Sequence, residues 1–213
     1  MAGPAPILQI FAREPIPGAV KTRLAATIGA ERAAEVYREL TQATLQHAQR
    51  ARALGHGAAV ELWCTPRTGT PWFDACALVA GASQHLQPRG DLGLRMRVAI
   101  AAGLTRAECV LLIGTDCPLL DAAAIAAAAA MLTTHDAVLV PAEDGGFVLV
   151  GARLPVAFAG VRMSTAHATH DTLEVFVQAG LRCGMLPQLW DVDEAADLER
   201  WQRLPTGPGV AAR

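Results

Sequence analysis

Short runs of apolar residues alternate along this chain with longer stretches in which apolar residues recur every three or four positions. The short runs are typical of strands buried on both faces, and they cover residues 7–12, 58–64, 84–87, 109–114, 137–141, 147–151, 181–185 and 189–192. The longer stretches predict helices over residues 30–53, 71–77 and 194–202, with three more that end near residues 104, 133 and 179. Strands that alternate with helices predict an α/β fold with a mainly parallel sheet covered on both faces.

Polar segments directly follow three of the predicted strands. A basic loop with Arg13, Lys21 and Arg23 follows the first strand, Asp116 follows the strand over 109–114, and Asp144 follows the strand over 137–141. Because ligands bind at the carboxyl ends of parallel strands, these segments are expected to converge at one edge of the sheet.

The basic loop after the first strand has the composition of a phosphate-binding loop. Gly18 and two prolines favour a fixed backbone, Lys21 offers a point charge, and Arg13 and Arg23 offer forked donors for phosphate oxygens. A solvated basic loop is the alternative. Neither the Walker phosphate loop nor the glycine fingerprint of dinucleotide-binding folds is present in the sequence.

Asp116 ends the most hydrophobic predicted strand, where a carboxylate is costly unless it binds a cation. Mg²⁺ suits this place because it prefers one or two carboxylates together with substrate phosphates. Asp191 and Asp193 alternate along a predicted strand end, so only one is expected to face the site and complete a metal site with Asp116. The alternatives are a turn or cap role for Asp116, and capping of the last helix by Asp191 or Asp193. Asp197 resembles ordinary helix surface.

Four further residues, Asp91, Asp144, Gly145 and Gly146, are candidates for substrate binding. Asp144 precedes Gly145 and Gly146, which allow a backbone to approach a ligand closely, although an ordinary Asp-Gly turn is an equally good interpretation. Asp91 is predicted to cap a helix that ends at Leu104, with a role near a nucleotide or on a solvated face. Asp121 is predicted to cap a helix ending near residue 133, and Ser164 or Thr165 one ending at residue 179.

The composition limits the remaining classes of function. The 213 residues, 52% hydrophobic and 18% charged, predict one globular domain over 1–213 with a frayed tail from 205 to 213. A net charge of −2 gives no reason to expect binding to nucleic acid or to a membrane. Five dispersed cysteines argue against disulfides and zinc, and no signal peptide is recognised, so a cytoplasmic protein is expected. The oligomeric state stays open, a homo-oligomer included.

Five ordered motifs together resemble a known bacterial family. They are PIPGAVKTRL, GDLGLRM, IGTDCPLL, PAEDGGFVLVG and DVDEAADL, spread from residue 7 to residue 198. The family is of glycosyltransferase-A-like transferases, often linked with radical-SAM enzymes, within the nucleotide-diphospho-sugar transferase superfamily. That superfamily includes the molybdenum-cofactor and phospholactate guanylyltransferases. The resemblance implies a three-layer α/β/α, Rossmann-like fold.

The resemblance also implies roles for single residues. Lys21 and Arg23 would hold nucleotide phosphates, Asp116 would bind Mg²⁺ with Asp193 as a second metal contact, and Asp144 with the two glycines would line the acceptor site. Two departures are present. The first loop differs from the typical nucleotidyltransferase loop, and Met163 stands where the family commonly has tryptophan, which removes an aromatic stacking contact.

The function expected from these residues is Mg²⁺-dependent transfer from a nucleotide substrate. Nucleotidyl transfer from a nucleoside triphosphate to a small phosphorylated acceptor comes first, since it needs no covalent nucleophile and no nucleophile signature is found. Glycosyl transfer from a nucleotide sugar is the nearest alternative. A non-catalytic nucleotide-binding protein is a third.

Overall fold

The computed structural model describes residues 6–55 and 59–204. Within them one seven-stranded sheet has the order β3-β2-β1-β4-β6-β5-β7, and β6 alone runs antiparallel to its neighbours. The strands are β1 (Ile7–Arg13), β2 (Ala59–Thr65), β3 (Ser83–Leu86), β4 (Val110–Ile113), β5 (Ala137–Pro141), β6 (Phe147–Ala152) and β7 (Cys183–Met185). The predicted mainly parallel α/β sheet is confirmed.

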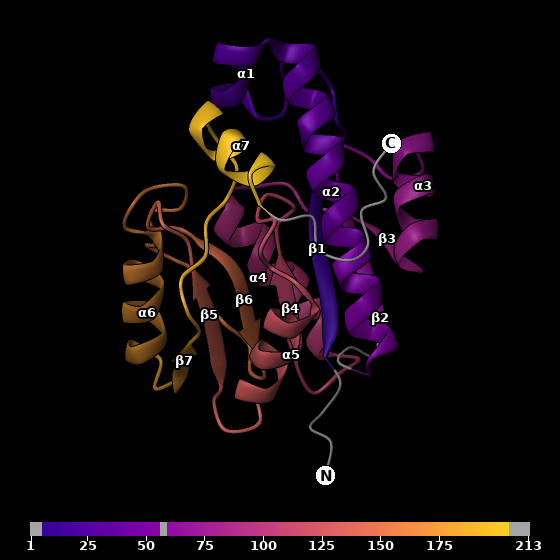
Figure 1. The fold of residues 1–213 in the computed structure, drawn as a ribbon. Coiled ribbons are helices and arrows are strands. Elements are labelled where there is room, and N and C mark those ends of the chain that lie inside the picture. The colour runs from indigo at the N-terminus through magenta and orange to yellow at the C-terminus, as the bar shows by residue number, and fades with distance from the viewer. Residues whose placement is uncertain (1–5, 56–58, 205–213) are drawn as a thin grey trace.

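Helices cover both faces of this sheet, as the ribbon in Figure 1 shows. On one face lie α2 (Ala30–Ala53), α3 (Pro71–Ala80) and α5 (Ala122–Met131), whose buried side chains pack with alternate residues of the strands. On the other face lie α4 (Leu92–Leu104) and α6 (Ala168–Gln178). Burial on both faces explains why the central strands read as continuous apolar runs, and it confirms the three-layer arrangement.

Two short helices, α1 (Thr22–Ile28) and α7 (Ala195–Gln202), lie beside each other beyond the strand ends (Figure 1). A small separate core joins them to the first half of α2, with Leu24 and Leu40 packed against Trp190 and Leu198. Helix α7 is thereby attached to the segment that follows β1. Among the described helices, none is long and apolar enough to cross a membrane.

The connection between β5 and β6 departs from strict alternation of strands and helices. These strands are consecutive and antiparallel, with Ala137 opposite Ala152, and a tight turn over residues 142–146 joins them. Gly145 has a φ of +85°, which an L side chain adopts only with strain. The predicted Asp-Gly turn is therefore present, and it places Asp144 at the same edge of the sheet as the ends of β1 and β4.

Several predicted boundaries are wrong, each for a local reason. The helix expected from Ser164 or Thr165 begins only at Ala168, because Ser164 has a left-handed backbone with φ 59°. The strand expected over 189–192 is reduced to one bridge between Leu189 and Ala142. A helix begins at Thr22, so Arg23 lies in its first turn and not in the loop. The predicted strand start at residue 58 and the tail from 205 lie outside the described residues.

The cysteines behave as the sequence predicts. The five cysteines all lie in the described residues and form no disulfide, and four of them are buried and Cys183 partly so. Burial raises the pKa of Cys117 to about 11 and that of Cys64 to about 12, so both stay protonated near neutral pH. These side chains are small buried hydrophobes and not nucleophiles.

Candidate functional site

A pocket of about 320 Å³ opens at the carboxyl edge of the sheet. Its walls come from the ends of β1 and β4, the turn before β6, the start of α4, and the segments around residues 164 and 192. A second pocket of about 430 Å³ adjoins it under the loop before α1. Six residues line both: Arg13, Arg23, Tyr37, Asp116, Ser164 and Asp193. The segments expected to converge at this edge do converge there.

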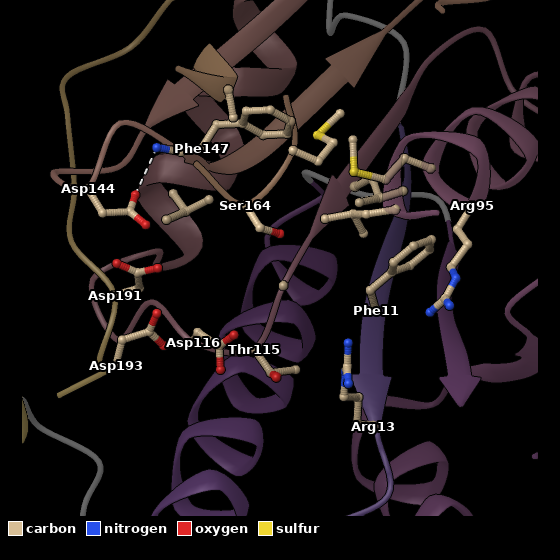
Figure 2. A pocket seen from close by; sticks show the side chains of 18 of the residues that line it. Phe11, Arg13, Arg95, Thr115, Asp116, Asp144, Phe147, Ser164, Asp191 and Asp193 are labelled. Atoms are coloured by element: carbon tan, nitrogen blue, oxygen red, sulfur yellow. Dashed lines mark hydrogen bonds between the residues drawn. The ribbon is translucent and has the colours of Figure 1, made fainter. Parts of the chain in front are cut away.

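Four aspartates line one side of the first pocket, as Figure 2 shows. Asp144, Asp191 and Asp193 each offer a carboxylate oxygen, and these oxygens lie within 4.8 Å of one another. Asp116 lies beside them, at the end of β4, and the backbone N–H of Val192 donates to its carbonyl oxygen over 2.9 Å. Carboxylates that converge in this way favour a divalent cation with oxygen ligands.

Lys21 is bound to two of these aspartates. Its ammonium nitrogen Nζ lies 2.6 Å from Oδ1 of Asp116 and 3.0 Å from Oδ1 of Asp193. Arg23 also pairs with Asp193, from the exposed side. The Lys21 side chain is only 4% exposed. Burial alone would lower the pKa of Lys21, but the charges of Asp116 and Asp193 raise it above its ordinary value.

Asp116 keeps part of its carboxylate open although it pairs with Lys21. Its Oδ1 is buried and makes no directed hydrogen bond, so the contact with Lys21 is an ion pair alone. The side chain as a whole is 43% exposed and faces both pockets. Asp116 is therefore free to contribute an oxygen to a ligand in either pocket.

Asp191 carries the least compensated charge of the group. Burial, followed by the charges of Asp193 and Asp144, raises the pKa of its carboxyl to about 6. Within the described residues it forms no ion pair, unlike Asp193. A cation among these carboxylates would relieve this repulsion, so the donor set fits Mg²⁺.

Basic and aromatic side chains line the opposite side of the pocket, where Figure 2 places Arg13, Arg95 and Phe11. Arg95 is oriented by its Nε, which donates to the carbonyl oxygen of Gly90 over 2.8 Å. The guanidinium of Arg13 forms no ion pair with any described residue, and its backbone N–H donates to the Tyr37 hydroxyl over 2.8 Å. Acids and free cations therefore face each other across the pocket.

The segment around Ser164 forms the wall nearest α6 and is held firmly. Arg162 donates to Asp171 from its backbone N–H and from two guanidinium nitrogens, over 3.0, 2.8 and 2.8 Å. These bonds hold the pKa of the Asp171 carboxyl well below its usual range. Lys21 and Ser164, with φ of 48° and 59°, are the non-glycine residues with positive φ in the described chain, and both line the second pocket. Such strain persists where the surrounding structure fixes the backbone.

The structure brings most of the predicted site residues together. Arg13, Arg23, Asp116, Asp144, Gly146 and Asp193 line the first pocket, and Lys21 lines the second.

Three others lie outside both linings, and each has a structural reason for its identity. Asp91 caps α4 by accepting from the backbone N–H of Leu94 over 2.8 Å. Gly145 is needed because a Cβ there would meet the carbonyl oxygen of Ala166 at 2.2 Å, and Gly18 is needed for its φ of +79°.

Two expectations about the acidic segment are wrong. Asp191 and Asp193 both line the pocket, because residues two positions apart in an extended segment point to the same side and not to opposite sides. Asp197 is no ordinary surface residue, since its carboxylate accepts from the backbone N–H groups of Asp193 and Glu194 over 3.0 and 2.8 Å. The capping-box spacing of Glu194 and Asp197 is a local signal that could have revealed this.

The sequence interpretation missed Tyr37, which ties the ends of β1 and β4 together. Its hydroxyl accepts from Arg13 N–H and from Thr115 Oγ1, the latter over 3.2 Å. Burial, then the charge of Asp116, raises the pKa of this phenol. Tyr37 sits at an ordinary apolar position of the predicted helix, so nothing local distinguished it.

Comparison with known families identifies the chain. The profile of a family described as an uncharacterized protein conserved in bacteria (DUF2064) matches residues 44–165, more than half of the sequence. The chain belongs to this family. No curated protein matches it significantly.

Solved structures extend the likeness of this DUF2064 member. A Desulfovibrio desulfuricans G20 protein, provisionally described as a nucleotide-diphospho-sugar transferase, superposes with a TM-score of 0.83 at 29% identity, over 95% of this chain and 88% of that one. CMP:2-keto-3-deoxy-manno-octonic acid synthetase, in complex with CTP, superposes with a TM-score of 0.55 at 13% identity, over 94% of this chain and 98% of that one. Glucosyl-3-phosphoglycerate synthase from Mycobacterium tuberculosis, in complex with Mn²⁺, UDP and glucosyl-3-phosphoglycerate, superposes with a TM-score of 0.53 at 12% identity. The superposition covers 92% of this chain and 75% of that one.

These likenesses support the nucleotide-diphospho-sugar transferase superfamily and confirm the glycosyltransferase-A-like fold that the sequence motifs implied. The two structures with 13% and 12% identity show a similar fold and support no statement about function. A link to radical-SAM enzymes and a closer relation to the two guanylyltransferases stay predictions.

Proposed function

We propose that this protein is a Mg²⁺-dependent transferase that uses a nucleotide substrate, with nucleotidyl transfer from a nucleoside triphosphate to a small phosphorylated acceptor as its reaction. The observation that carries this proposal is the cluster of Asp144, Asp191 and Asp193, whose oxygens lie within 4.8 Å, opposite the unpaired Arg13. A phosphate chain needs both a cation held by carboxylates and cationic side chains.

The metal would be held by Asp144, Asp191 and Asp193, with the open part of Asp116 beside them. When bound, Mg²⁺ supplies neutralisation of negative charge on the reacting phosphates. Lys21 has a role that differs from the expected grip on phosphate, because its ammonium is already shared by Asp116 and Asp193. It fixes these two carboxylates in place.

Arg13 and Arg95, and not Lys21, would bind phosphate groups. Both line the pocket, and guanidinium groups bind phosphate oxygens with paired donors. In the reaction an acceptor phosphate oxygen forms a bond to the α-phosphorus, the bond from that phosphorus to the bridging oxygen breaks, and pyrophosphate leaves. The arginines hold the acceptor phosphate beside the α-phosphorus and offset its negative charge as the new bond forms. No protein nucleophile is needed, consistent with the protonated thiol of Cys117.

Glycosyl transfer from a nucleotide sugar is the second candidate. It is favoured by the provisional description of the Desulfovibrio desulfuricans G20 protein, the one relative here with 29% identity. The two reactions differ in their products, because nucleotidyl transfer releases pyrophosphate and glycosyl transfer releases a nucleoside diphosphate.

The first test is a thermal-shift panel of the four nucleoside triphosphates and several nucleotide sugars, each with and without Mg²⁺. A ligand that binds only the folded state raises the melting temperature. A Mg²⁺-dependent shift with one triphosphate supports nucleotidyl transfer and names the base, and a shift with a nucleotide sugar alone supports glycosyl transfer. If no nucleotide raises the melting temperature, the non-catalytic alternative replaces the proposal.

The second test uses the nucleotide found in this way. Asp116→Asn should lower Mg²⁺-dependent turnover by at least about 100-fold while the fold stays intact. Asp121→Asn is the matched control. Asp121 lies on the same connection after β4 but caps α5 by accepting from Ala124 N–H over 2.9 Å, and asparagine caps equally well. Full turnover in Asp116→Asn would remove Asp116 from the mechanism.

A further inference from the structure

The wall of the first pocket between the aspartates and the arginines is apolar. Six side chains form it: Phe11, Leu92, Met96, Leu112, Phe147 and Met163. In Figure 2 the ring of Phe147 lies near the acidic side and that of Phe11 near the basic side, with the sulfur atoms of the view between them. The pocket therefore has an acidic side, a basic side and a continuous apolar surface that joins them.

Two polar side chains next to this wall, Gln87 and Thr115, are already bonded within the protein. The amide nitrogen of Gln87 donates to the carbonyl oxygens of Trp63 and Ala12, over 2.9 and 3.4 Å, and the Thr115 hydroxyl donates to that of Tyr37. A sugar ring against this surface would bury several hydroxyls without partners, which is costly for each one. An apolar ring or chain would instead cover the apolar wall, and the burial of this surface from water would favour binding.

The two arginines on the basic side of the pocket would bind the charged end of a ligand whose body lies on the apolar wall. Arg95 is oriented by its bond to the carbonyl oxygen of Gly90, which leaves its terminal nitrogens for a ligand. Arg13 has no ion pair among the described residues. Both arginines lie next to the apolar wall, so an anionic group on an apolar body satisfies wall and arginines together.

We propose that the acceptor of this enzyme is a phosphate monoester of an apolar alcohol, aromatic or aliphatic, and not a sugar phosphate. This inference rests on the proposed transferase function and names its second substrate. Met163 suits the role, because a thioether adapts its shape to different apolar ligands where a tryptophan would fill the space.

Isothermal titration calorimetry of the full chain with Mg²⁺ tests the proposal, with phenyl phosphate and glucose 1-phosphate as probes and inorganic phosphate as the baseline. Phenyl phosphate should bind at least about tenfold more tightly than glucose 1-phosphate, as burial of a ring predicts. Met163→Ala and Phe147→Ala should each weaken phenyl phosphate about fivefold and leave inorganic phosphate unchanged. Met185→Ala, an exposed methionine on β7 outside the pocket, should change neither.

The arginines have their own matched pair. Arg95→Ala should weaken phenyl phosphate and inorganic phosphate alike, by about tenfold. Arg97→Ala should change neither, since Arg97 lies on the same helix but is exposed and outside the lining.

Two results would overturn the proposal. One is equal or tighter binding of glucose 1-phosphate by the wild-type protein. The other is mutual exclusion of phenyl phosphate and the nucleotide, because the wall would then hold the nucleobase. Failure of the proposed function looks different: no nucleotide would bind or turn over, whatever phenyl phosphate does. If a nucleotide binds but phenyl phosphate is not preferred over glucose 1-phosphate, the acceptor assignment is wrong and the proposed function is not affected.

Discussion

Arg200 of α7 holds Glu143 through two hydrogen bonds, 2.7 Å from Nη1 to Oε2 and 3.1 Å from Nη2 to Oε1. The central carbon of the same guanidinium lies 4.3 Å from the ring centroid of Trp190. Glu143 directly precedes Asp144, and Trp190 directly precedes Asp191. Since Asp197 of α7 also fixes the backbone of Asp193, one short helix orients all three clustered carboxylates.

Arg200→Ala should therefore weaken binding of Mn²⁺ or Mg²⁺ by about tenfold, the usual scale for residues that orient metal ligands. Titration calorimetry with the metal alone measures this. Arg203→Ala is the control, because Arg203 lies on the same turn of chain but pairs only with the exposed Glu199 over 3.0 Å. Equal metal affinity in the two variants would show that α7 does not organise the cluster.

Lys21→Ala should lower stability as well as activity. Without the ammonium, Asp116 loses its ion pair and faces Asp193, which keeps only the exposed Arg23, and the expected loss is about 2 kcal/mol, below the range for fully buried pairs because Asp116 is 43% exposed. Mg²⁺ should restore part of this loss. Urea unfolding with and without Mg²⁺ measures it, and Arg23→Ala, whose side chain is 61% exposed, should cost less than about 1 kcal/mol. If both variants unfold at the same urea concentration, the buried ion pair is not what holds the loop.

Asp191 should make stability depend on pH between about 4 and 6. Its pKa in the folded protein is raised from 3.8 to about 6, so ionisation destabilises the fold, fully above pH 6 and progressively less as the pH falls through 6. With metal removed, Asp191→Asn should be more stable than wild type at pH 7.5 by about 1 kcal/mol, after a discount for partial exposure. The gain should disappear near pH 4. A gain that is the same at both pH values would assign it to packing and not to charge.

Gly145→Ala should damage the site through the backbone. The new Cβ would meet the carbonyl oxygen of Ala166 at 2.2 Å and displace the segment that carries Ser164, at a cost of about 3 kcal/mol. Gly18→Ala is the matched comparison: its φ of +79° is similar, but nothing lies within 4 Å, so only about 1 kcal/mol is expected. Thermal melting of both variants checks the difference, and equal losses would mean that left-handed strain alone decides the outcome.

The features predicted correctly from the sequence are those that depend on local chemistry. The helix over Ala30–Ala53 has the predicted bounds because its apolar period is unbroken, and Asp91 and Asp121 cap their helices through hydrogen bonds three residues away. The convergence of loops at one edge followed from parallel strands, which is a general property of such sheets.

The partners of Lys21 could not be predicted in the same way. Asp193 lies 172 residues further along the chain, and only the packing of α1 against α7 brings the two together. The sequence therefore indicated a phosphate ligand for a lysine that binds carboxylates. The expectation that only one of Asp191 and Asp193 faces the site is wrong for a local reason, since side chains two residues apart along a strand share one face.

The left-handed backbones of Lys21 and Ser164 set a limit on how this protein can be improved. Each costs folding free energy, of order 1 kcal/mol or more, that glycine would recover. A screen for thermostable variants would thus enrich glycine at position 164 and discard a hydroxyl that lines the pocket, whereas at position 21 the loss of the two ion pairs would outweigh the recovered strain. Stability selection and selection for this site therefore act in opposite directions at position 164 and in the same direction at position 21.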